Sequence, residues 1–113
     1  MHEYAITESI LEIVQTEAVE AGARRVDEVK VVIGELSSFA ESSIEFYFEE
    51  LSRGTVAEGA CLVFEKLEAN AECCACGSGF RPRNAFYSCP ACGSRLFELK
   101  RGKELYIDSI EVE

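Results

Sequence analysis

Residues 73–93 read CCACGSGFRPRNAFYSCPACG and contain two Cys-x-x-Cys-Gly motifs. The first motif contributes Cys73 and Cys76, the second contributes Cys89 and Cys92, and 12 residues separate the two. The two-residue gap within each motif lets both sulfur atoms reach one ion. Two such pairs place four thiolates at the corners of a tetrahedron, as zinc prefers, with Zn–S distances of about 2.3 Å. The glycine after each motif permits a tight turn that leaves backbone N–H groups free to bond the sulfurs. The stretch therefore predicts a four-cysteine zinc site.

Other interpretations of the cysteines stay open. Disulfides are disfavoured because the rest of the chain is typical of a cytosolic protein, and a rubredoxin-like iron site or a thiol redox centre remains an alternative. A zinc ion held by four cysteines offers no open position to a substrate, so we expect a structural role rather than a catalytic one. Cys74 has the wrong spacing for either motif and is interpreted as a non-ligand thiol. We interpret Cys61 as a buried, small apolar residue of a strand.

Charge divides the chain into two parts. The 113 residues include 11 Lys and Arg against 21 Asp and Glu, a net charge of −10. Residues 1–72 carry 16 acidic and 5 basic side chains, and residues 73–113 carry 5 acidic and 6 basic ones. This balance disfavours nucleic-acid and anionic-membrane partners, which need clustered Lys and Arg. No apolar run approaches the roughly 20 residues of a spanning helix, and the first residues lack the order of a signal peptide. We therefore expect a cytoplasmic protein.

Apolar periodicity predicts two amphipathic helices in the acidic part. The first covers residues 6–21, ends at Gly22 and has an apolar stripe formed by Ile6, Ile10, Ile13, Val14 and Ala18. The second starts near Ser42, which has the spacing of a capping box with Glu45, and ends by Gly54. Its stripe consists of Ile44, Tyr47, Phe48 and Leu51.

Alternating apolar residues predict strands at residues 27–33 and 60–67, and two more at 95–100 and 103–112. The cysteine-rich segment lies between the second and third of these strands. It has few apolar side chains of its own, so metal binding must supply most of its folding free energy.

The single histidine of the chain is His2. An exposed, frayed terminus without a role is the simplest interpretation of it. However, the Met1 α-amine, the His2 imidazole and the neighbouring backbone amides are close enough along the chain to chelate one ion, and the Glu3 carboxylate is a further oxygen donor. Nitrogen-rich, square-planar ligation suits Ni(II) or Cu(II). A catalytic role for His2 is disfavoured because the sequence contains no nucleophile motif, phosphate-binding loop or HExxH pair.

In this order along nearly the whole chain, several motifs resemble the HypA/HybF nickel metallochaperones. The residues that carry the resemblance are Met1-His2-Glu3-Tyr4, Val32-Ile33-Gly34-Glu35-Leu36-Ser37, Arg53-Gly54-Thr55, Glu58-Gly59-Ala60, the two cysteine motifs and Lys103-Glu104-Leu105 with Ser109-Ile110-Glu111-Val112. The family assists nickel insertion during maturation of [NiFe]-hydrogenases.

The resemblance implies two metal sites and an α+β fold. His2 would be the principal Ni(II) ligand, with Glu3, the Met1 amine and nearby backbone nitrogens helping, and nickel would be transferred cargo. Structural Zn(II) would be held by Cys73, Cys76, Cys89 and Cys92. In some relatives an acidic residue after the first strand also approaches nickel. Ala40 occupies that place here, and Glu41 beside it is not assigned as a ligand.

The same resemblance implies the domain organisation and the partners. A nickel-binding domain of two helices and a three-stranded sheet would comprise residues 1–67 and 104–113, and an inserted four-cysteine, zinc-ribbon-like module would comprise residues 68–103. The partners would be the GTPase HypB and the [NiFe]-hydrogenase large-subunit precursor. We expect neither nucleic acid nor membrane as a partner, no enzymatic activity, and a monomer or weak homodimer.

Two other functions remain as alternatives. A zinc-ribbon adaptor in transcription or RNA processing would use a small basic and aromatic surface, consisting of Arg81, Arg83, Arg95, Phe80, Phe86 and Tyr87. The acidic charge of residues 1–72 opposes this function. A thiol redox protein would use one of the Cys-x-x-Cys pairs.

Overall fold

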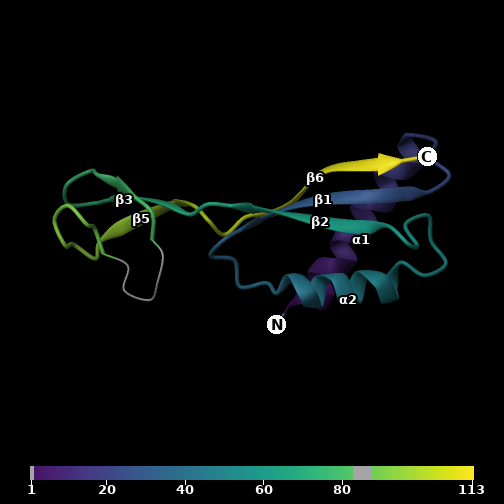
Figure 1. Cartoon of the computed structure of the whole chain (residues 1–113), viewed down its shortest axis with the longest axis horizontal. Helices are drawn as coiled ribbons and strands as arrows, with labels where there is room; N and C mark the ends of the chain where they lie inside the picture. Colours follow the sequence, from purple (N-terminus) through teal and green to yellow (C-terminus); the bar gives the residue numbers. More distant parts are fainter. Residues whose placement is uncertain (1, 83–87) are drawn as a thin grey trace. The chain divides into compact units, whose positions relative to one another are not determined.

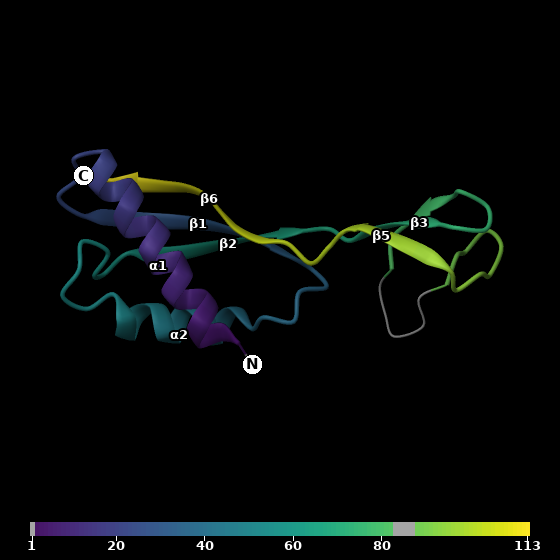
Figure 2. The ribbon, with the colours of Figure 1, turned by 180° about the vertical axis from the view of Figure 1, so that it is seen from behind.

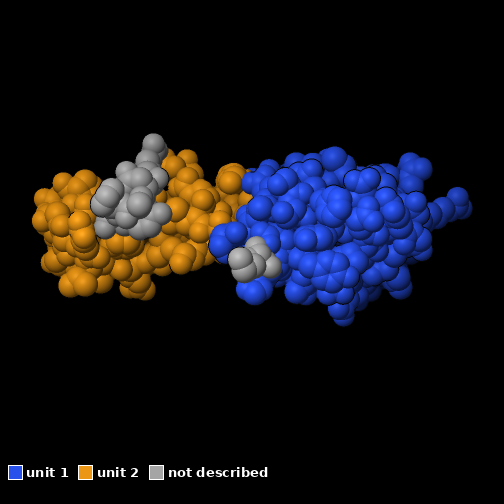
Figure 3. Space-filling view, turned by 90° about the horizontal axis from the view of Figure 1, so that it is seen from below, with its two compact units in different colours: residues 1–32, 38–65, 106–113 blue, residues 33–37, 66–105 orange. Residues whose placement is uncertain are grey.

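The computed structural model describes residues 2–82 and 88–113, and it divides the chain into two units. Unit 1 comprises residues 1–32, 38–65 and 106–113, and unit 2 comprises residues 33–37 and 66–105 (Figure 3). Each unit is thus assembled from segments that are far apart in the sequence, and the four cysteines of the two motifs all belong to unit 2.

Helix α1 (Glu3–Glu20) starts three residues earlier than the sequence predicts. Its buried face consists of Glu3, Thr7, Ile10, Leu11, Val14 and Ala18. These positions recur at three- and four-residue steps, as one face of a helix requires. The assignment of Ile13 to this face was wrong: its side chain is 49% exposed. The two polar residues in the first turns complete the buried face, and an apolar pattern does not include them. Gly22 ends the helix as predicted, with a positive φ of 65°.

Helix α2 (Glu41–Leu51) follows the predicted periodicity, with Ile44 and Phe48 buried. The predicted capping box at Ser42 is wrong, because the residue at the N-cap is Ala40 and no side chain caps the helix from that position. The Ala40 N–H instead donates to the carboxylate Oε2 of Glu3, at 2.9 Å. This bond joins the start of α1 to the start of α2, and the two helices pack against each other.

The strands β1 (Val26–Gly34), β2 (Cys61–Leu67) and β6 (Leu105–Val112) form a three-stranded sheet in the order β2-β1-β6 (Figure 1). The central strand β1 supplies most of the core, with Val29, Val31 and Ile33 each at most 1% exposed. Figure 2 shows α1 crossing one face of this sheet. After β6, the backbone N–H of Glu113 donates to the carbonyl of Arg25 at 3.0 Å, which holds the end of β6 beside the start of β1.

Cys61 begins β2 and is exposed, so its prediction as a buried strand residue was wrong. It lies at the start of an edge strand, whose outer side has no neighbouring strand among the described residues. The apolar alternation of residues 60–67 identifies the strand but does not identify its place in the sheet.

Unit 2 contains a second sheet, of β3 (Asn70–Cys73), β4 (Gly79–Phe80) and β5 (Phe97–Arg101) in the order β4-β3-β5. Both pairings are antiparallel, with Ala71 opposite Phe80 and Cys73 opposite Phe97. The rings of Phe80 and Phe97 meet edge to face, with their centroids 5.4 Å apart. The sequence predicted a strand over residues 95–100 but neither β3 nor β4, which are too short to show an alternating pattern.

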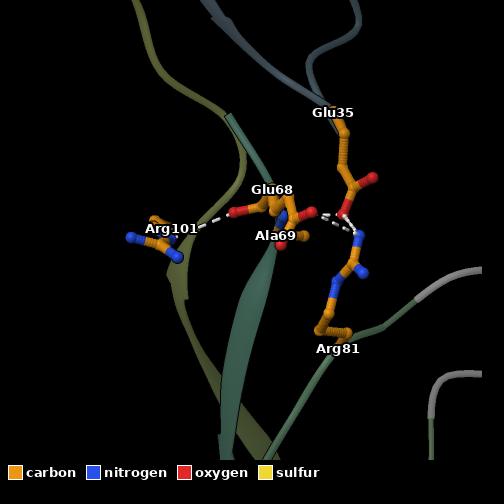
Figure 4. A network of polar contacts seen from close by, with 5 residues as sticks. All are labelled: Glu35, Glu68, Ala69, Arg81 and Arg101. Atoms are coloured by element: carbon orange, nitrogen blue, oxygen red, sulfur yellow. Dashed lines mark hydrogen bonds and ion pairs between the residues drawn. The ribbon is translucent and has the colours of Figure 1, made fainter. Parts of the chain in front are cut away.

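Residues 33–37 are hydrogen-bonded to the segment that leads from β2 to the four-cysteine segment of unit 2. Glu35 donates its backbone N–H to the carbonyl of Leu67 (2.9 Å), and its carboxylate accepts the N–H of the buried Ala69 (2.6 Å). The same carboxylate lies 3.5 Å from the guanidinium of Arg81, which also lies 3.6 Å from the Glu68 carboxylate (Figure 4). Glu35 therefore holds a backbone segment and a charged side chain of unit 2 together.

Candidate metal centre

The two cysteine motifs bring four sulfur atoms together. The sulfurs of Cys73, Cys76, Cys89 and Cys92 all lie within 4.8 Å of one another. Across the motifs, the Sγ atoms of Cys73 and Cys92 are 3.5 Å apart, and those of Cys76 and Cys89 are 3.6 Å apart. A tetrahedral zinc ion with Zn–S distances of about 2.3 Å requires sulfurs separated by about 3.8 Å. The arrangement therefore fits zinc without any rearrangement of the backbone.

Each motif forms the same tight turn. The N–H of Gly77 donates to the carbonyl of Cys73 at 2.9 Å, and the N–H of Gly93 donates to the carbonyl of Cys89 at 2.7 Å. Both glycines have φ near +76°, a conformation that residues with a β-carbon rarely adopt. In each turn the first cysteine is buried and the second is exposed. The local sequence therefore determines the shape of the site.

Backbone N–H groups of the first turn point at a sulfur. The Ala75 and Cys76 amides lie 3.3 Å and 3.4 Å from the Sγ of Cys73, and they lower the pKa of that thiol. The hydroxyl and backbone N–H of Ser78 lower the pKa of Cys76 to about 6. The backbone donors confirm the prediction that N–H groups of the turn bond the sulfurs. The Ser78 hydroxyl was not identified from the sequence, although a serine directly after each Cys-x-x-Cys-Gly motif is a signal that could have indicated it.

The pKa of the Cys92 thiol is shifted in the opposite direction. The Ser94 N–H favours the thiolate of Cys92, but the neighbouring sulfurs of the other three cysteines oppose it and raise the pKa of Cys92 to about 12. Four thiolates this close repel one another, so complete ionisation of the set requires a cation in their midst. The charge of the donor set, like its geometry, fits a divalent ion.

The other two cysteines lie outside this cluster. Cys74 is exposed, and its backbone N–H donates to the carbonyl of Leu96 at 2.8 Å. Cys61 belongs to unit 1. Neither joins the four sulfurs that converge, in agreement with the spacing argument for Cys74.

His2 and Glu3, two of the predicted nickel ligands, lie in different surroundings. His2 is exposed and directly precedes α1, and its carbonyl accepts the N–H of Ile6 at 3.1 Å. Glu3 is 7% exposed and is joined to Ala40. Met1 lies outside the described residues, and within them no group of three metal-binding side chains surrounds His2.

Only part of the predicted basic and aromatic surface lies within the described residues. Arg81 pairs with two carboxylates, and Arg83, Phe86 and Tyr87 lie outside the described residues. Among the described residues, no helix has the length and apolar character needed to cross a membrane.

Comparisons with known proteins agree over the full length of the chain. A family model described as "Hydrogenase/urease nickel incorporation, metallochaperone, hypA" matches residues 1–112. The chain is 44% identical to a hydrogenase maturation factor HypA of Caldanaerobacter subterraneus subsp. tengcongensis and 43% identical to one of Geobacter metallireducens, with complete coverage of both proteins.

Solved structures support the same relationship. The solution structure of the nickel metallochaperone HypA from Helicobacter pylori superposes with a TM-score of 0.71 at 28% identity, covering 99% of this chain and 97% of that one. A second solution structure, of a protein named HypA, gives a TM-score of 0.75 at 27% identity, covering 100% of this chain and 97% of that one. Over residues 2–82 and 88–113, two helices, two three-stranded sheets and a four-cysteine cluster are thus found together with a full-length family match, and the chain belongs to the HypA family of nickel metallochaperones for hydrogenase maturation.

Proposed function

We propose that this protein binds Ni(II) at its N-terminus and assists insertion of that ion into a [NiFe]-hydrogenase during its maturation. The full-length family match is the observation that carries the proposal. The exposure of His2, immediately before α1, supports it, since an accessible imidazole can pass an ion to another protein.

His2 is the principal nickel ligand in this proposal, and the Met1 amine and nearby backbone nitrogens complete a nitrogen-rich set. The Glu3 carboxylate is the weaker candidate, because its Oε2 already accepts the Ala40 N–H. That bond also gives Glu3 a second role. It fixes the first turn of α1 against the start of α2, so the residue before it, His2, projects from an anchored helix end.

Zinc has a structural role in the proposal. Cys73, Cys76, Cys89 and Cys92 hold the ion and leave no position for a substrate. Bound zinc supplies folding free energy to unit 2, whose apolar core among the described residues is small. The protein acts by delivering a metal rather than by catalysis, because the exposed terminal site exchanges its ion and the four-cysteine site retains its own.

The family relationship supports the remaining parts of the proposal. The partners are the GTPase HypB and the hydrogenase large-subunit precursor, in the cytoplasm, and the protein is a monomer or weak homodimer. Nickel binding belongs to a domain of residues 1–67 and 104–113, and zinc binding to a module of residues 68–103.

The test is a nickel titration of the zinc-loaded protein with a native, untagged N-terminus. His2→Gln is compared with Glu17→Gln, which removes an exposed polar group from the far part of the same helix. We expect one nickel per chain in the parent and in Glu17→Gln, and loss of that nickel with zinc retained in His2→Gln. Equal nickel binding by all three proteins would contradict the proposal and favour a zinc-ribbon adaptor.

A further inference from the structure

A groove of about 520 Å³ lies between α2 and the start of β2, entirely within unit 1. Glu45, Phe46 and Glu49 line it from the helix, and Cys61 and Leu62 line it from the strand. Phe46 is 59% exposed, although most aromatic rings of this size are covered in a folded domain. Figure 1 shows α2 running beside β2.

The strand that borders this groove has a free edge. Among the described strands, β2 has a single neighbour, β1. An edge strand directs alternate backbone N–H and C=O groups away from its sheet and so can pair with another extended chain. Charged side chains usually protect such edges. In β2 they occur only at Glu65 and Lys66, whereas residues 61–64 next to the groove are uncharged and are exposed or half-buried.

The charge around the groove is of one sign. Glu45 and Glu49 are one helical turn apart, a spacing at which like charges repel. Neither a lysine nor an arginine lines the groove. Unit 1 as a whole contains 16 acidic and 4 basic residues. A ligand that places positive charge beside these two carboxylates would therefore be favoured electrostatically.

We propose that this groove and the free edge of β2 form a docking surface for an extended segment of a partner protein that carries basic and apolar side chains on the same face. The segment adds a strand to β2, which supplies backbone hydrogen bonds. One of its apolar side chains packs against Phe46, and its basic side chains lie beside Glu45 and Glu49. The role of this docking surface rests on the proposed function. It holds the protein that donates or accepts nickel on the unit that carries His2.

An aromatic cluster links the groove to the N-terminal helix. The ring of Phe46 meets that of Tyr47 at a centroid distance of 5.5 Å, and Tyr47 meets Tyr4 at 5.4 Å, both edge to face. Tyr4 is half exposed and follows His2 by two residues. A partner seated on Phe46 is therefore on the same continuous aromatic surface that leads to the proposed nickel ligand.

The test uses the full, zinc-loaded chain without nickel, so that its outcome is independent of nickel binding. The probe is the capped six-residue peptide Thr-Lys-Thr-Val-Thr-Lys, whose lysines and valine share one face when the chain is extended, and the control peptide has glutamate in place of lysine. Amide chemical shifts and amide hydrogen exchange are followed by NMR. We expect shifts confined to residues 42–52 and 59–67, new protection of β2 amides, and no effect of the glutamate peptide.

Two variants of the groove and two matched controls complete the test. Phe46→Ser is expected to weaken lysine-peptide binding about tenfold, since the ring no longer covers an apolar side chain. Glu45→Gln with Glu49→Gln is expected to weaken it about fivefold. The matched controls are Val19→Ser, an exposed apolar residue of α1, and Glu12→Gln with Glu17→Gln, which removes the same charge from α1.

Several outcomes would overturn the proposal. These are the absence of chemical-shift changes at millimolar peptide, changes on β6 instead of β2, and an equal loss of lysine-peptide affinity in the α1 control variants. Protection of the β2 amides that rises with protein concentration in the absence of peptide would assign the edge to a second copy of this chain. Each of these results leaves the nickel titration unaffected, so failure here is distinguishable from failure of the nickel proposal.

Discussion

Replacing Gly34 by alanine should strongly destabilise unit 2. A β-carbon at Gly34 would lie 2.2 Å from both the carbonyl carbon and the oxygen of Gly102, and 2.6 Å from the backbone nitrogen of Lys103. These are backbone atoms, so no side-chain rotation relieves the contact. Two hydrogen bonds hold the same backbone segments together, from the Gly34 N–H to the Glu104 carbonyl (2.8 Å) and from the Leu36 N–H to the Gly102 carbonyl (2.7 Å).

The size of the loss in stability follows from the need to move those two backbone segments apart. Overpacking costs about 1–3 kcal/mol, and each backbone hydrogen bond contributes about 0.5–1.5 kcal/mol net. We therefore expect Gly34→Ala to lower the free energy of unfolding by about 4 kcal/mol, the middle of the range these two contributions span.

The assay is urea unfolding of zinc-saturated protein, followed by far-ultraviolet circular dichroism. Gly79→Ala is the matched control in the same unit, because its nearest contact would be the Ala71 oxygen at 3.9 Å. We expect this control to stay within about 1 kcal/mol of the parent. A Gly34→Ala protein that unfolds within about 1 kcal/mol of the parent would refute the reasoning, since it would mean that the two backbones are not in close contact.

Other predictions concern the polar network of Figure 4 and the thiols. Glu35→Ala should lower stability by about 1–3 kcal/mol in the same urea assay, because the buried Ala69 N–H loses its acceptor; an unchanged midpoint would contradict this. Cys89→Ser should lose zinc by elemental analysis whereas Cys74→Ser retains it, and zinc loss from both would place Cys74 in the site.

The four-cysteine cluster could be predicted from the sequence because its determinants are local. Each pair of ligands lies within four residues, and the following glycine sets the turn, so spacing alone specifies the geometry. The helices and the strands of the first sheet were predicted for a similar reason, since their apolar periodicity is a property of neighbouring residues. The two-unit division also has a signal in the sequence, where the acidic part gives way to the cysteine-rich part.

The contacts that escaped prediction join residues far apart in the chain. Glu3 meets Ala40 across 37 positions, and Glu35 meets Ala69 across 34. In both cases a carboxylate accepts a backbone N–H, and any residue type but proline could supply that donor. The partner is therefore invisible in the sequence. Cys61 illustrates a related difficulty, because its exposure depends on β2 being an edge strand beside a groove rather than on its own neighbours.

Strand β6 is synthesised after the other two strands of its sheet, and this order has a consequence for folding. The sheet of unit 1 has β1 at its centre, and its second partner, β6, is the last strand of the chain to leave the ribosome. Between β2 and β6 lie residues 68–104, which take roughly 2–7 s to translate at roughly 5–20 residues per second. Until β6 follows, one side of β1 has no partner, although the four cysteines precede β6 along the chain. The four-cysteine cluster is thus made before the sheet of unit 1 is complete, and the unit that carries His2 is completed last even though its first helix is made first.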